Sequence, residues 1–372
     1  MKNVFFAHSV NVIGGAERVT LSVMEGVKTH YRCIMLAPDG GELGLKAQQS
    51  GAVFEPVSCG QAEILHPVRT LRQFAQYARL IRKYSPEIVH TGDLLAFRSL
   101  QPICKLLKIP MVCHVHFPYD KGFMKWAFDR TSPVASFIYC SEELKSNLSP
   151  FLSQLVPAAR HTVIHNGINT EDFSPGKPRS EDQPLNVGII GNLQKRKGHE
   201  DFLNMARIIV QKGLQVRFHI IGGDILEQPR EPLLKAMAIK LNIDQYVVFH
   251  GQVSDVRSLL ADQDIIVCAS HEEAFPITIL EAMACAKAIV TTNVNGIPEA
   301  LNKHTGILVP PHSPAELAEG VITLIEQPAL RANIAQNARE RVVENFDQSL
   351  FIKQILNLYE STLVPAGICH DA

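Results

Sequence analysis

Two glutamates, Glu273 and Glu281, lie eight positions apart in the part of the chain whose residue types most clearly suggest chemistry. The apolar run Ile265–Cys268 before them predicts a buried parallel strand, and a helix is expected from near Ile277. A second strand is expected at Ala288–Thr292. In such a unit, ligands bind beyond the carboxyl end of the first strand, against the N-terminus of the helix. Both carboxylates are therefore expected at one ligand site.

The chemistry of such a site can be read from its groups. A helix N-terminus offers free N–H groups and partial positive charge, which suit a phosphate, whereas carboxylates accept hydrogen bonds from neutral hydroxyls. A ligand that carries both a diphosphate and hydroxyls is a nucleotide sugar. Acidic residues near a helix start are also common simply because they complement the helix dipole, so the two carboxylates alone leave this structural explanation open.

The residues around the glutamates favour a nucleotide-sugar site over a purely structural role at the helix start. The spacing Glu-x7-Glu from Glu273 to Glu281, followed by Ala-Met-Ala-Cys, resembles the signature of the retaining glycosyltransferases of family 4. The resemblance implies that Glu273 lies beside the donor sugar and that Glu281 holds the nucleotide ribose. It also assigns the intervening loop and helix start to donor binding, namely Phe275, Pro276 and Ile277.

Two alanines depart from the family pattern. Ala274 and Ala286 stand where the family has glycine. Such a replacement is mild if the backbone φ at that position is negative, although each alanine adds a methyl group beside the site.

A basic loop follows the expected strand Leu185–Ile190. It runs from Asn192 to Gly198 and contains Arg196 and Lys197, and it precedes a helix expected over 199–211. Cations at the carboxyl end of a strand can neutralise a diphosphate, although the loop alone could also be a solvated basic turn. The family has Gly-Arg and then Lys-Gly here, and both cations bind the donor diphosphate.

The first of those two cations is missing from this sequence. Lys197 keeps its place, but Gly191-Asn192 replaces the Gly-Arg pair. Either Arg196 substitutes for the missing arginine, or Asn192 donates a neutral hydrogen bond to the donor.

The first half of the chain contributes a glycine pair and a histidine. Gly14 and Gly15 lie between a strand expected over 2–8 and a helix expected from about Ala16, and paired glycines allow a ligand to approach the backbone closely. They do not form G-x-G-x-x-G, so a dinucleotide fingerprint is absent. They match the family's G-G-A-E loop, which borders donor and acceptor.

A strand expected over 110–116 ends in two histidines. The resemblance places His116 beside the transferred sugar, whereas His114, two residues earlier, is expected to be a packed core residue. A histidine at a strand end is also frequently structural.

Length and alternation predict the architecture. A chain of 372 residues is long enough for two domains, and strands that alternate with helices predict parallel, doubly wound sheets. The family resemblance, which includes a hinge-like run over 163–175, implies the GT-B fold: two Rossmann-like parallel-sheet lobes that face each other across a cleft. We expect an acceptor-side lobe over 1–175, an exposed linker over 176–184 and a nucleotide-sugar lobe over 185–347. A final helix over about 348–361 is expected to return to the first lobe.

Composition excludes several classes of protein. A net charge of −1 gives the whole chain no nucleic-acid footprint. The eight cysteines show no C-x-x-C spacing, so they are interpreted as small buried hydrophobes of a reducing compartment rather than zinc ligands or disulfides. No signal peptide or membrane span is expected. The pattern Asp262-Gln-Asp264 precedes its strand and is interpreted as a turn feature rather than a metal site.

Two stretches leave a membrane interaction open. The segment 64–86 contains five cations and no acidic residue, and the segment 121–130 mixes cations with large apolar residues, among them Phe123, Met124, Trp126 and Phe128. Basic residues with interfacial aromatics suit an anionic lipid surface. A solvated basic helix and ordinary core packing are the alternative. The protein is accordingly expected in the cytoplasm, either free or peripheral on the inner membrane face.

These residues and the family resemblance together imply a retaining glycosyltransferase. It would move a sugar from a nucleotide diphosphate sugar to a glycan or lipid-linked acceptor, in cell-surface polysaccharide or glycolipid synthesis, with no metal or other cofactor. One alternative is a regulator that binds nucleotide sugars but has weakened catalysis. The other is a different GT-B enzyme, such as a nucleotide-sugar epimerase or a phosphorylase, although the cofactor lysine or phosphate cluster of a phosphorylase is not evident.

Overall fold

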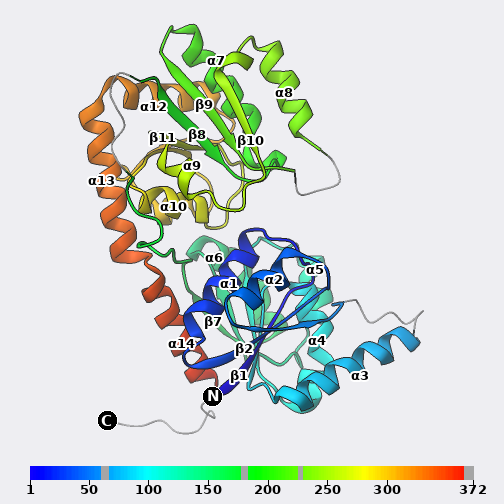
Figure 1. Ribbon diagram of the computed structural model, residues 1–372. Helices are drawn as coiled ribbons and strands as arrows, with labels where there is room; N and C mark the ends of the chain where they lie inside the picture. Colours follow the sequence, from blue (N-terminus) through cyan, green and yellow to red (C-terminus); the bar gives the residue numbers. More distant parts are fainter. Residues whose placement is uncertain (60–66, 177–182, 225–228, 364–372) are drawn as a thin grey trace, which may run out of the picture. The chain divides into compact units, whose positions relative to one another are not determined.

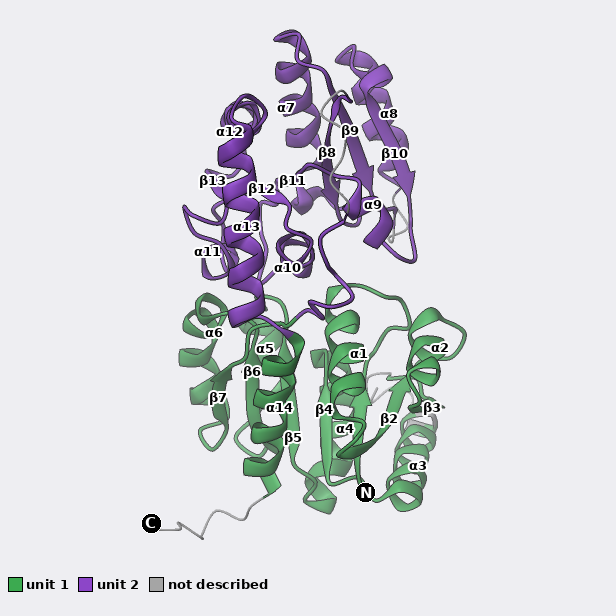
Figure 2. Ribbon diagram, turned by 60° about the vertical axis from the view of Figure 1, so that its left-hand side comes forward, with its two compact units in different colours: residues 1–167, 348–372 green, residues 168–347 purple. Residues whose placement is uncertain are grey.

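The structure is a computed structural model that describes residues 1–59, 67–176, 183–224 and 229–363 (Figure 1). The chain divides into two compact units, drawn in different colours in Figure 2. Unit 1 comprises residues 1–167 and 348–372, and unit 2 comprises residues 168–347. The expected first lobe ran to residue 175, but Ile168 already belongs to unit 2, where its N–H donates to the carbonyl of Phe346 (2.9 Å). Most of the expected linker over 176–184 lies outside the described residues.

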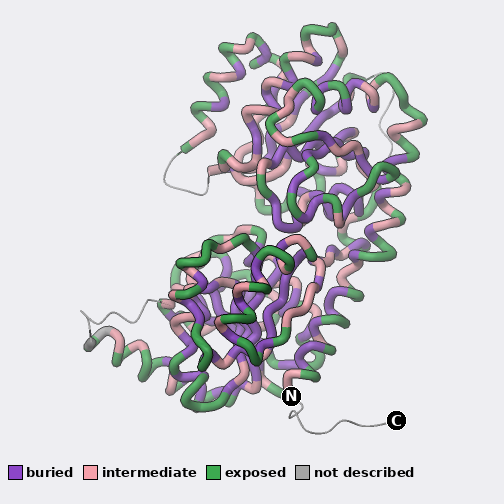
Figure 3. The backbone as a smooth tube through the Cα atoms, turned by 180° about the vertical axis from the view of Figure 1, so that it is seen from behind, coloured by how far each residue is buried: buried purple, intermediate pink, exposed green. Residues whose placement is uncertain are grey.

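Unit 1 is built on a seven-stranded parallel sheet of order β3-β2-β1-β4-β5-β6-β7. Its strands are β1 (Lys2–Ala7), β2 (Tyr31–Ala37), β3 (Val53–Pro56), β4 (Ile88–Thr91), β5 (Met111–Val115), β6 (Val134–Tyr139) and β7 (Arg160–Val163). The central strands are buried on both faces because helices cover each side of a parallel sheet. Figure 3 shows buried segments, in purple, in the interior of the unit.

The helices of unit 1 connect successive strands, and one comes from the end of the chain. They are α1 (Gly15–Val27), α2 (Glu42–Gln49), α3 (Pro67–Tyr84), α4 (Leu94–Leu107), α5 (Lys121–Ala127), α6 (Glu142–Leu155) and α14 (Gln348–Leu363). Helix α14 packs against α1, where the side-chain amide of Gln348 donates to the Ser22 hydroxyl (3.0 Å) and Ile352 lies over Gly26. Sequence reasoning did not identify α5, α6 or β7.

Unit 2 contains a six-stranded parallel sheet of order β10-β9-β8-β11-β12-β13. Its strands are β8 (Leu185–Ile190), β9 (Val216–Ile221), β10 (Val247–Gly251), β11 (Ile265–Cys268), β12 (Ala288–Thr292) and β13 (Ile307–Val309). Its helices are η1 (Lys195–Lys197), α7 (His199–Gln211), α8 (Glu231–Lys240), η2 (Asp244–Tyr246), α9 (Arg257–Ala261), α10 (Ile277–Ala284), α11 (Ile297–Ala300), α12 (Pro314–Glu326) and α13 (Pro328–Asn345). The expected helices at 199–211 and from Ile277 are confirmed.

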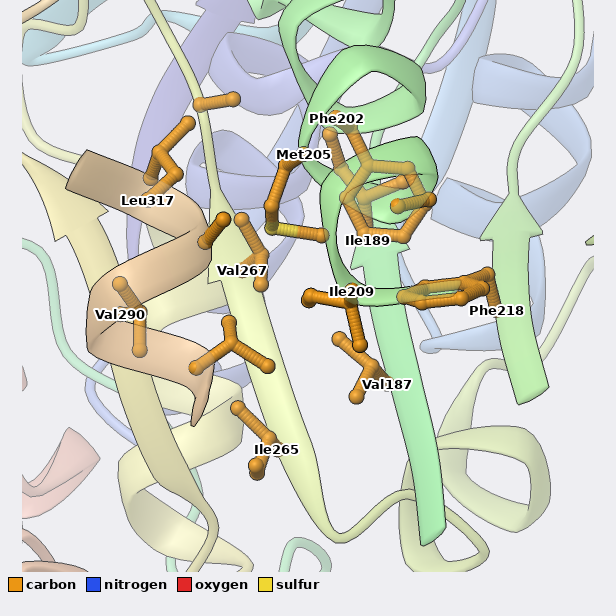
Figure 4. Packing of buried hydrophobic residues seen from close by; sticks show 14 of the residues in the cluster. Val187, Ile189, Phe202, Met205, Ile209, Phe218, Ile265, Val267, Val290 and Leu317 are labelled. Atoms are coloured by element: carbon orange, nitrogen blue, oxygen red, sulfur yellow. The ribbon is translucent and has the colours of Figure 1, made fainter. Parts of the chain in front are cut away.

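The core of unit 2 fixes the strands that carry its loops. Figure 4 shows Phe202 and Met205 of α7 and Leu317 of α12 packed over the β8 and β11 side chains Val187 and Val267. These side chains are almost fully buried, and burying one such apolar side chain stabilises the fold by about 1.5–3 kcal/mol. The carboxyl ends of β8 and β11 are thus held by a dry core.

Strand order creates one switch point in each sheet. In unit 1 the chain runs outward from β1 to β3 and then returns to β4 beside β1; in unit 2 it runs from β8 to β10 and returns to β11 beside β8. Loops leave in opposite directions at such a point, which opens a crevice at the carboxyl ends of the two strands. The loops after β1 and β4, and those after β8 and β11, are therefore the places to look for sites. Among the helices of the described ranges, none combines the length and apolar character that a membrane crossing requires.

Candidate functional site

The switch point of unit 2 joins two residues that the sequence had singled out. Lys197 lies in η1, in the loop after β8, and Glu273 lies in the loop after β11. The Lys197 ammonium forms an ion pair with Oε2 of Glu273. Their side chains are 19% and 11% exposed, so the pair is partly desolvated and yet open to a ligand. Opposite charges here suit a ligand that carries both a phosphate and hydroxyls.

Close backbone packing holds the two loops together. Gly198, directly after Lys197, has φ +69°, and a Cβ there would lie 1.9 Å from the carbonyl oxygen of Ala269. Only glycine fits at this position, because any side chain would collide with the backbone of the other loop. The N–H of His271 also donates to the carbonyl of Arg196 (2.7 Å). The loop after β8 is therefore positioned directly against the loop after β11.

Two residues that sequence reasoning missed support Glu273. The Ser270 hydroxyl donates to Oε2 of Glu273 (3.4 Å), and the Glu273 N–H donates to Oδ1 of Asn295 (3.2 Å). Asn295 has a left-handed backbone with φ +41°, a conformation that asparagine adopts more readily than most residues. No sequence motif marks these two residues; the fold brings them to the site from the ends of β11 and β12.

The start of α10 lies just beyond Glu273. Pro276 is the N-cap, and Ile277 is the first helical residue, so the free N–H groups of the first turn point toward the carboxyl edge of the sheet. Glu281 is only 2% exposed, within the second turn of α10. The side chain of Phe275 is 4% exposed and packs against Phe346, with ring centroids 5.5 Å apart, so it contributes to the core.

Arg196, which the sequence suggested as a substitute for the missing arginine, has hydrogen-bond partners within its own unit. The Arg196 guanidinium donates from Nε to the side-chain oxygen of Gln194 (3.0 Å), and its Nη1 lies 3.4 Å from the carbonyl of Glu272. Arg196 is thus tied to its own neighbourhood, while Asn192 is half-buried in the same loop. Sequence reasoning missed Arg230, which precedes α8 after β9 and forms an ion pair with Glu200.

The positive charges at this edge affect the pKa of a neighbouring histidine, His199. Burial lowers the pKa of His199 to about 4, and the positive charges of Lys197 and Arg230 contribute to that shift. His199 is therefore neutral at physiological pH. Arg230 pairs with Glu200 in the first turn of α7, the helix that follows Lys197, so Arg230 is a second candidate for the missing cation.

The two alanines differ in backbone conformation. Ala286, directly after α10, has φ +50°, whereas Ala274 is not among the residues with positive φ. A left-handed alanine costs roughly 1–2 kcal/mol. The condition for a mild replacement, a negative φ, is therefore not met at Ala286, where glycine would relieve strain at the helix end.

The switch point of unit 1 carries a buried polar cluster. His8, which follows β1 and is fully buried, places Nδ1 3.4 Å from Oε1 of Glu17 and 3.7 Å from Oδ2 of Asp93. Its Nε2 lies 2.8 Å from the Thr20 hydroxyl. Burial raises the pKa of Glu17, but the hydrogen bond and charge of His8 outweigh it and the net pKa is lowered. The glycine at position 92 packs on the His8 ring, where a Cβ would come within 2.2 Å.

The glycine pair borders this cluster. Gly14 is the N-cap of α1, and its N–H donates to Oε2 of Glu17 (2.9 Å), which is the half of a capping box that needs no N-cap side chain. A Cβ on Gly15 would meet no atom within 4 Å, so open space adjoins its Cα.

His116 lies at the end of a chain of buried histidines. His90 Nδ1 lies 2.6 Å from the Tyr359 hydroxyl of α14, and His90 Nε2 lies 3.3 Å from His114 Nδ1. The His114 ring stacks on His116 with centroids 4.1 Å apart. Burial, followed by the charge of His8, lowers the pKa of His116 to about 3, so it is neutral. Among the described residues its buried Nε2 has no hydrogen-bond partner.

The pattern Asp262-Gln-Asp264 lies at the opposite edge of the unit 2 sheet. Oδ2 of Asp264 accepts from the N–H of Asn186 (2.8 Å), so this residue joins the amino ends of β8 and β11. It takes no part in the carboxyl-edge site.

Comparison with known proteins identifies families on both halves of the chain. Residues 13–172 match Glycosyltransferase Family 4, and residues 170–341 match Glycosyl transferases group 1. The chain is 27% identical over 318 residues to the capsular polysaccharide biosynthesis glycosyltransferase CapM of Staphylococcus aureus, a match that covers 79% of this chain and 81% of CapM.

The chain is also similar to a second transferase and to a solved structure. The chain is 29% identical over 209 residues to the N,N'-diacetylbacillosaminyl-diphospho-undecaprenol alpha-1,3-N-acetylgalactosaminyltransferase of Campylobacter jejuni, a match that covers 53% of each protein, so it spans about half of that enzyme. Anabaena HepE, whose structure was solved with UDP-glucose, superposes with a TM-score of 0.84 at 21% identity over 97% of this chain and 100% of HepE. This last likeness confirms the expected fold of two Rossmann-like lobes, the GT-B fold. Together, the two family matches span nearly the whole chain, which belongs to the group 1 glycosyltransferases of family 4.

Proposed function

We propose that the protein transfers a sugar from a nucleoside diphosphate sugar to an acceptor hydroxyl, with retention of configuration at the anomeric carbon. The observation that carries the proposal is the Lys197–Glu273 ion pair at the switch point of unit 2. A cation, a carboxylate and the start of α10 at one sheet edge offer complementary groups to both halves of such a donor.

Each group has a role in donor binding under this proposal. The donor diphosphate replaces the Glu273 carboxylate as the ion-pair partner of the Lys197 ammonium. The released carboxylate then accepts hydrogen bonds from sugar hydroxyls. The N–H groups at Ile277 contact the diphosphate, and Glu281 accepts from the ribose. Arg196 and Arg230 are both candidates for the second positive charge, although the first guanidinium donates to Gln194 and the second is paired with Glu200.

The reaction follows from these roles. The bond between the anomeric carbon and the β-phosphate oxygen breaks, and the acceptor oxygen forms its bond on the same face of the sugar. The acceptor proton passes to the leaving phosphate. Negative charge grows on that phosphate in the transition state, where Lys197 and the helix N-terminus stabilise it. The proposal thus assigns charge stabilisation to the protein's own groups rather than to a metal.

Unit 1 is proposed as the acceptor side. His116 presents a neutral, buried Nε2 that can exchange a hydrogen bond with a sugar hydroxyl. The similarity to CapM and to the Campylobacter transferase supports a glycan or lipid-linked acceptor and a place in polysaccharide or glycolipid synthesis.

A turnover panel tests the proposed reaction. Uridine, guanosine and adenosine diphosphate sugars are offered with short glycan and lipid-linked acceptors, and products are identified by mass spectrometry. We expect one donor to be consumed and the new linkage to keep the anomeric configuration of the donor, as read from NMR coupling constants. An inverted linkage would refute retention. Binding of a donor without any product would support a nucleotide-sugar-binding regulator, for which the left-handed Ala286 and the absent arginine are the favouring observations.

We also propose reversible contact of unit 1 with the anionic cytoplasmic membrane surface. Val68, Leu71 and Phe74 of α3 are 62%, 68% and 36% exposed, and they lie at helical spacing beside the exposed cations Arg72, Arg79, Arg82 and Lys83. Apolar side chains flanked by cations suit a lipid interface, and each cation adds roughly 1 kcal/mol near it. The 121–130 stretch contributes less, because Met124 and Phe128 are buried in the core.

Liposome co-sedimentation tests this contact. The wild type should pellet with vesicles that contain phosphatidylglycerol at low salt, and it should be released at high salt. Leu71→Ser should weaken pelleting severalfold, whereas Leu233→Ser, which changes an exposed leucine of α8, should leave it unchanged. Equal pelleting on neutral and anionic vesicles would contradict the proposal.

A further inference from the structure

Three side chains with metal-binding atoms meet at the carboxyl edge of the unit 2 sheet. Asp201 lies in the first turn of α7, His271 lies in the loop after β11, and His312 lies in the loop between β13 and α12. One ligand atom from each residue lies within 4.8 Å of the corresponding atoms of the other two. None of these residues takes part in the proposed donor contacts.

The contacts within this cluster are close. His271 Nε2 lies 2.7 Å from Oδ2 of Asp201, and these two side chains are 20% and 17% exposed. The rings of His271 and His312 have centroids 3.7 Å apart at an angle of 39°.

The backbone of His312 places its ring over His271. His312 has φ +59°, a left-handed conformation that histidine adopts more readily than most residues other than glycine. Its side chain is exposed, so the cluster opens to solvent on the His312 side. A cation could therefore enter from solvent and meet two nitrogen ligands and one oxygen ligand.

The ligand types select the cation. Mg²⁺ and Ca²⁺ prefer oxygen ligands throughout, whereas two imidazoles and a carboxylate suit Zn²⁺ and its neighbours in the first transition series. Ligand atoms around a tetrahedral Zn²⁺ with bonds of about 2.1 Å lie about 3.4 Å apart. The 2.7 Å between His271 Nε2 and Asp201 Oδ2 and the 4.8 Å limit for the three ligand atoms lie on either side of that value.

We propose that Asp201, His271 and His312 form a Zn²⁺ site with a fourth position left for water. The ion would tie the loop that contains Glu273 to α7 and to the loop after β13. The backbone N–H of His271 donates to the backbone carbonyl of Arg196. The bound ion would therefore also stiffen the contact with the loop that carries Lys197. Binding of the ion does not depend on the proposed transfer reaction.

Direct titration tests the site. The full-length chain, treated with a chelator and kept reduced, is titrated with ZnCl₂ against a chromophoric zinc indicator. We expect one Zn²⁺ per chain and a rise in melting temperature on binding. His312→Asn keeps a residue that tolerates the left-handed backbone and removes the imidazole, and it should weaken binding at least about tenfold, as should His271→Gln.

A matched control variant and a Co²⁺ spectrum test whether the cluster, rather than other histidines or cysteines, binds the ion. His304→Asn removes an exposed histidine outside the cluster and should leave Zn²⁺ affinity unchanged. Co²⁺ in the wild type should give visible bands of moderate intensity without the strong near-ultraviolet bands of thiolate ligation, a measurement that needs no variant. Absence of binding, wild-type affinity in the two cluster variants, or thiolate bands would each overturn the proposal.

Discussion

Lys197 and Glu273 neutralise each other across the switch point of unit 2, although they lie on loops that follow different strands. The pair is held in register by Gly198, whose Cα lies against the carbonyl of Ala269. A buried or half-buried ion pair that can exchange its partners suits a site that must accept a charged, hydroxylated ligand.

Lys197→Ala should lower kcat/KM for the nucleotide sugar by at least about tenfold, because it removes the cation that stabilises the leaving diphosphate. Steady-state kinetics with the preferred donor check this. Lys195→Ala is the matched control, since Lys195 is an exposed cation of the same short helix and should behave as the wild type. Equal activity of both variants would remove Lys197 from the site.

Glu273→Gln and Glu281→Gln should have different effects, because the first glutamate is proposed to contact the donor sugar and the second the nucleotide ribose. Each substitution keeps the size of the side chain and removes a charge-assisted acceptor, which costs about 1.5–3 kcal/mol per hydrogen bond. Glu273→Gln should reduce kcat with little change in the affinity for the free nucleoside diphosphate. Glu281→Gln should weaken that affinity, as measured by calorimetry. The reverse pattern would exchange the two assignments.

Gly198→Ala should destabilise unit 2 and reduce turnover, because the new methyl group would collide with the carbonyl of Ala269. Gly213→Ala is the comparison: Gly213 has a similar φ of +77°, but a methyl group on its Cα would meet no atom within 4 Å. Its cost should be that of a left-handed alanine alone, about 1–2 kcal/mol. Denaturant unfolding should show Gly198→Ala to be worse by roughly 2 kcal/mol or more. Equal losses would show that the two loops are not in tight contact.

Ala286→Gly should stabilise the protein by roughly 0.5–1 kcal/mol, because glycine relieves the left-handed strain after α10 while adding some entropy to the unfolded chain. Ala274→Gly, at a position without positive φ, should instead destabilise it by a similar amount. Chemical denaturation of both variants checks the difference in sign.

The stability of unit 1 should fall as the pH drops below about 6.5, the ordinary pKa of histidine. Burial lowers the pKa of His90 and of His116 to about 3 and that of His114 well below its ordinary value. Between these values and about 6.5 the unfolded chain binds up to about three more protons than the folded chain, so the free energy of unfolding decreases with falling pH, by up to about 4 kcal/mol per pH unit. Above about pH 7.5 these groups should contribute no slope.

The only tryptophan, Trp126, lies in α5 of unit 1, so its fluorescence reports the unfolding of this unit. His114→Phe should reduce the proton uptake on unfolding by about one, whereas His304→Asn should leave it as in the wild type. An unchanged pH slope in His114→Phe would show that the buried histidine chain is not the cause.

The sequence by itself determined the features that depend on neighbouring residues. Apolar runs predicted most strands, and the strand–loop–helix order around Glu273 and Glu281 predicted the start of α10 at Ile277, because side-chain periodicity and helix signals act over a few positions. Length and alternation predicted two parallel-sheet units, and the Glu-x7-Glu run indicated the family. Helix α6 was missed because its apolar positions are sparse and Pro150 interrupts the pattern.

Only the tertiary structure decided which distant residues meet. The return of the chain to β11 beside β8 pairs Lys197 with Glu273, and the same edge gathers Asp201, His271 and His312, whose spacing along the chain forms no recognisable motif. The positive φ of Ala286 depends on how α10 ends against β12. Strand order and crossover packing result from burying the faces of whole elements, and this sum over many non-local contacts cannot be read from any local pattern.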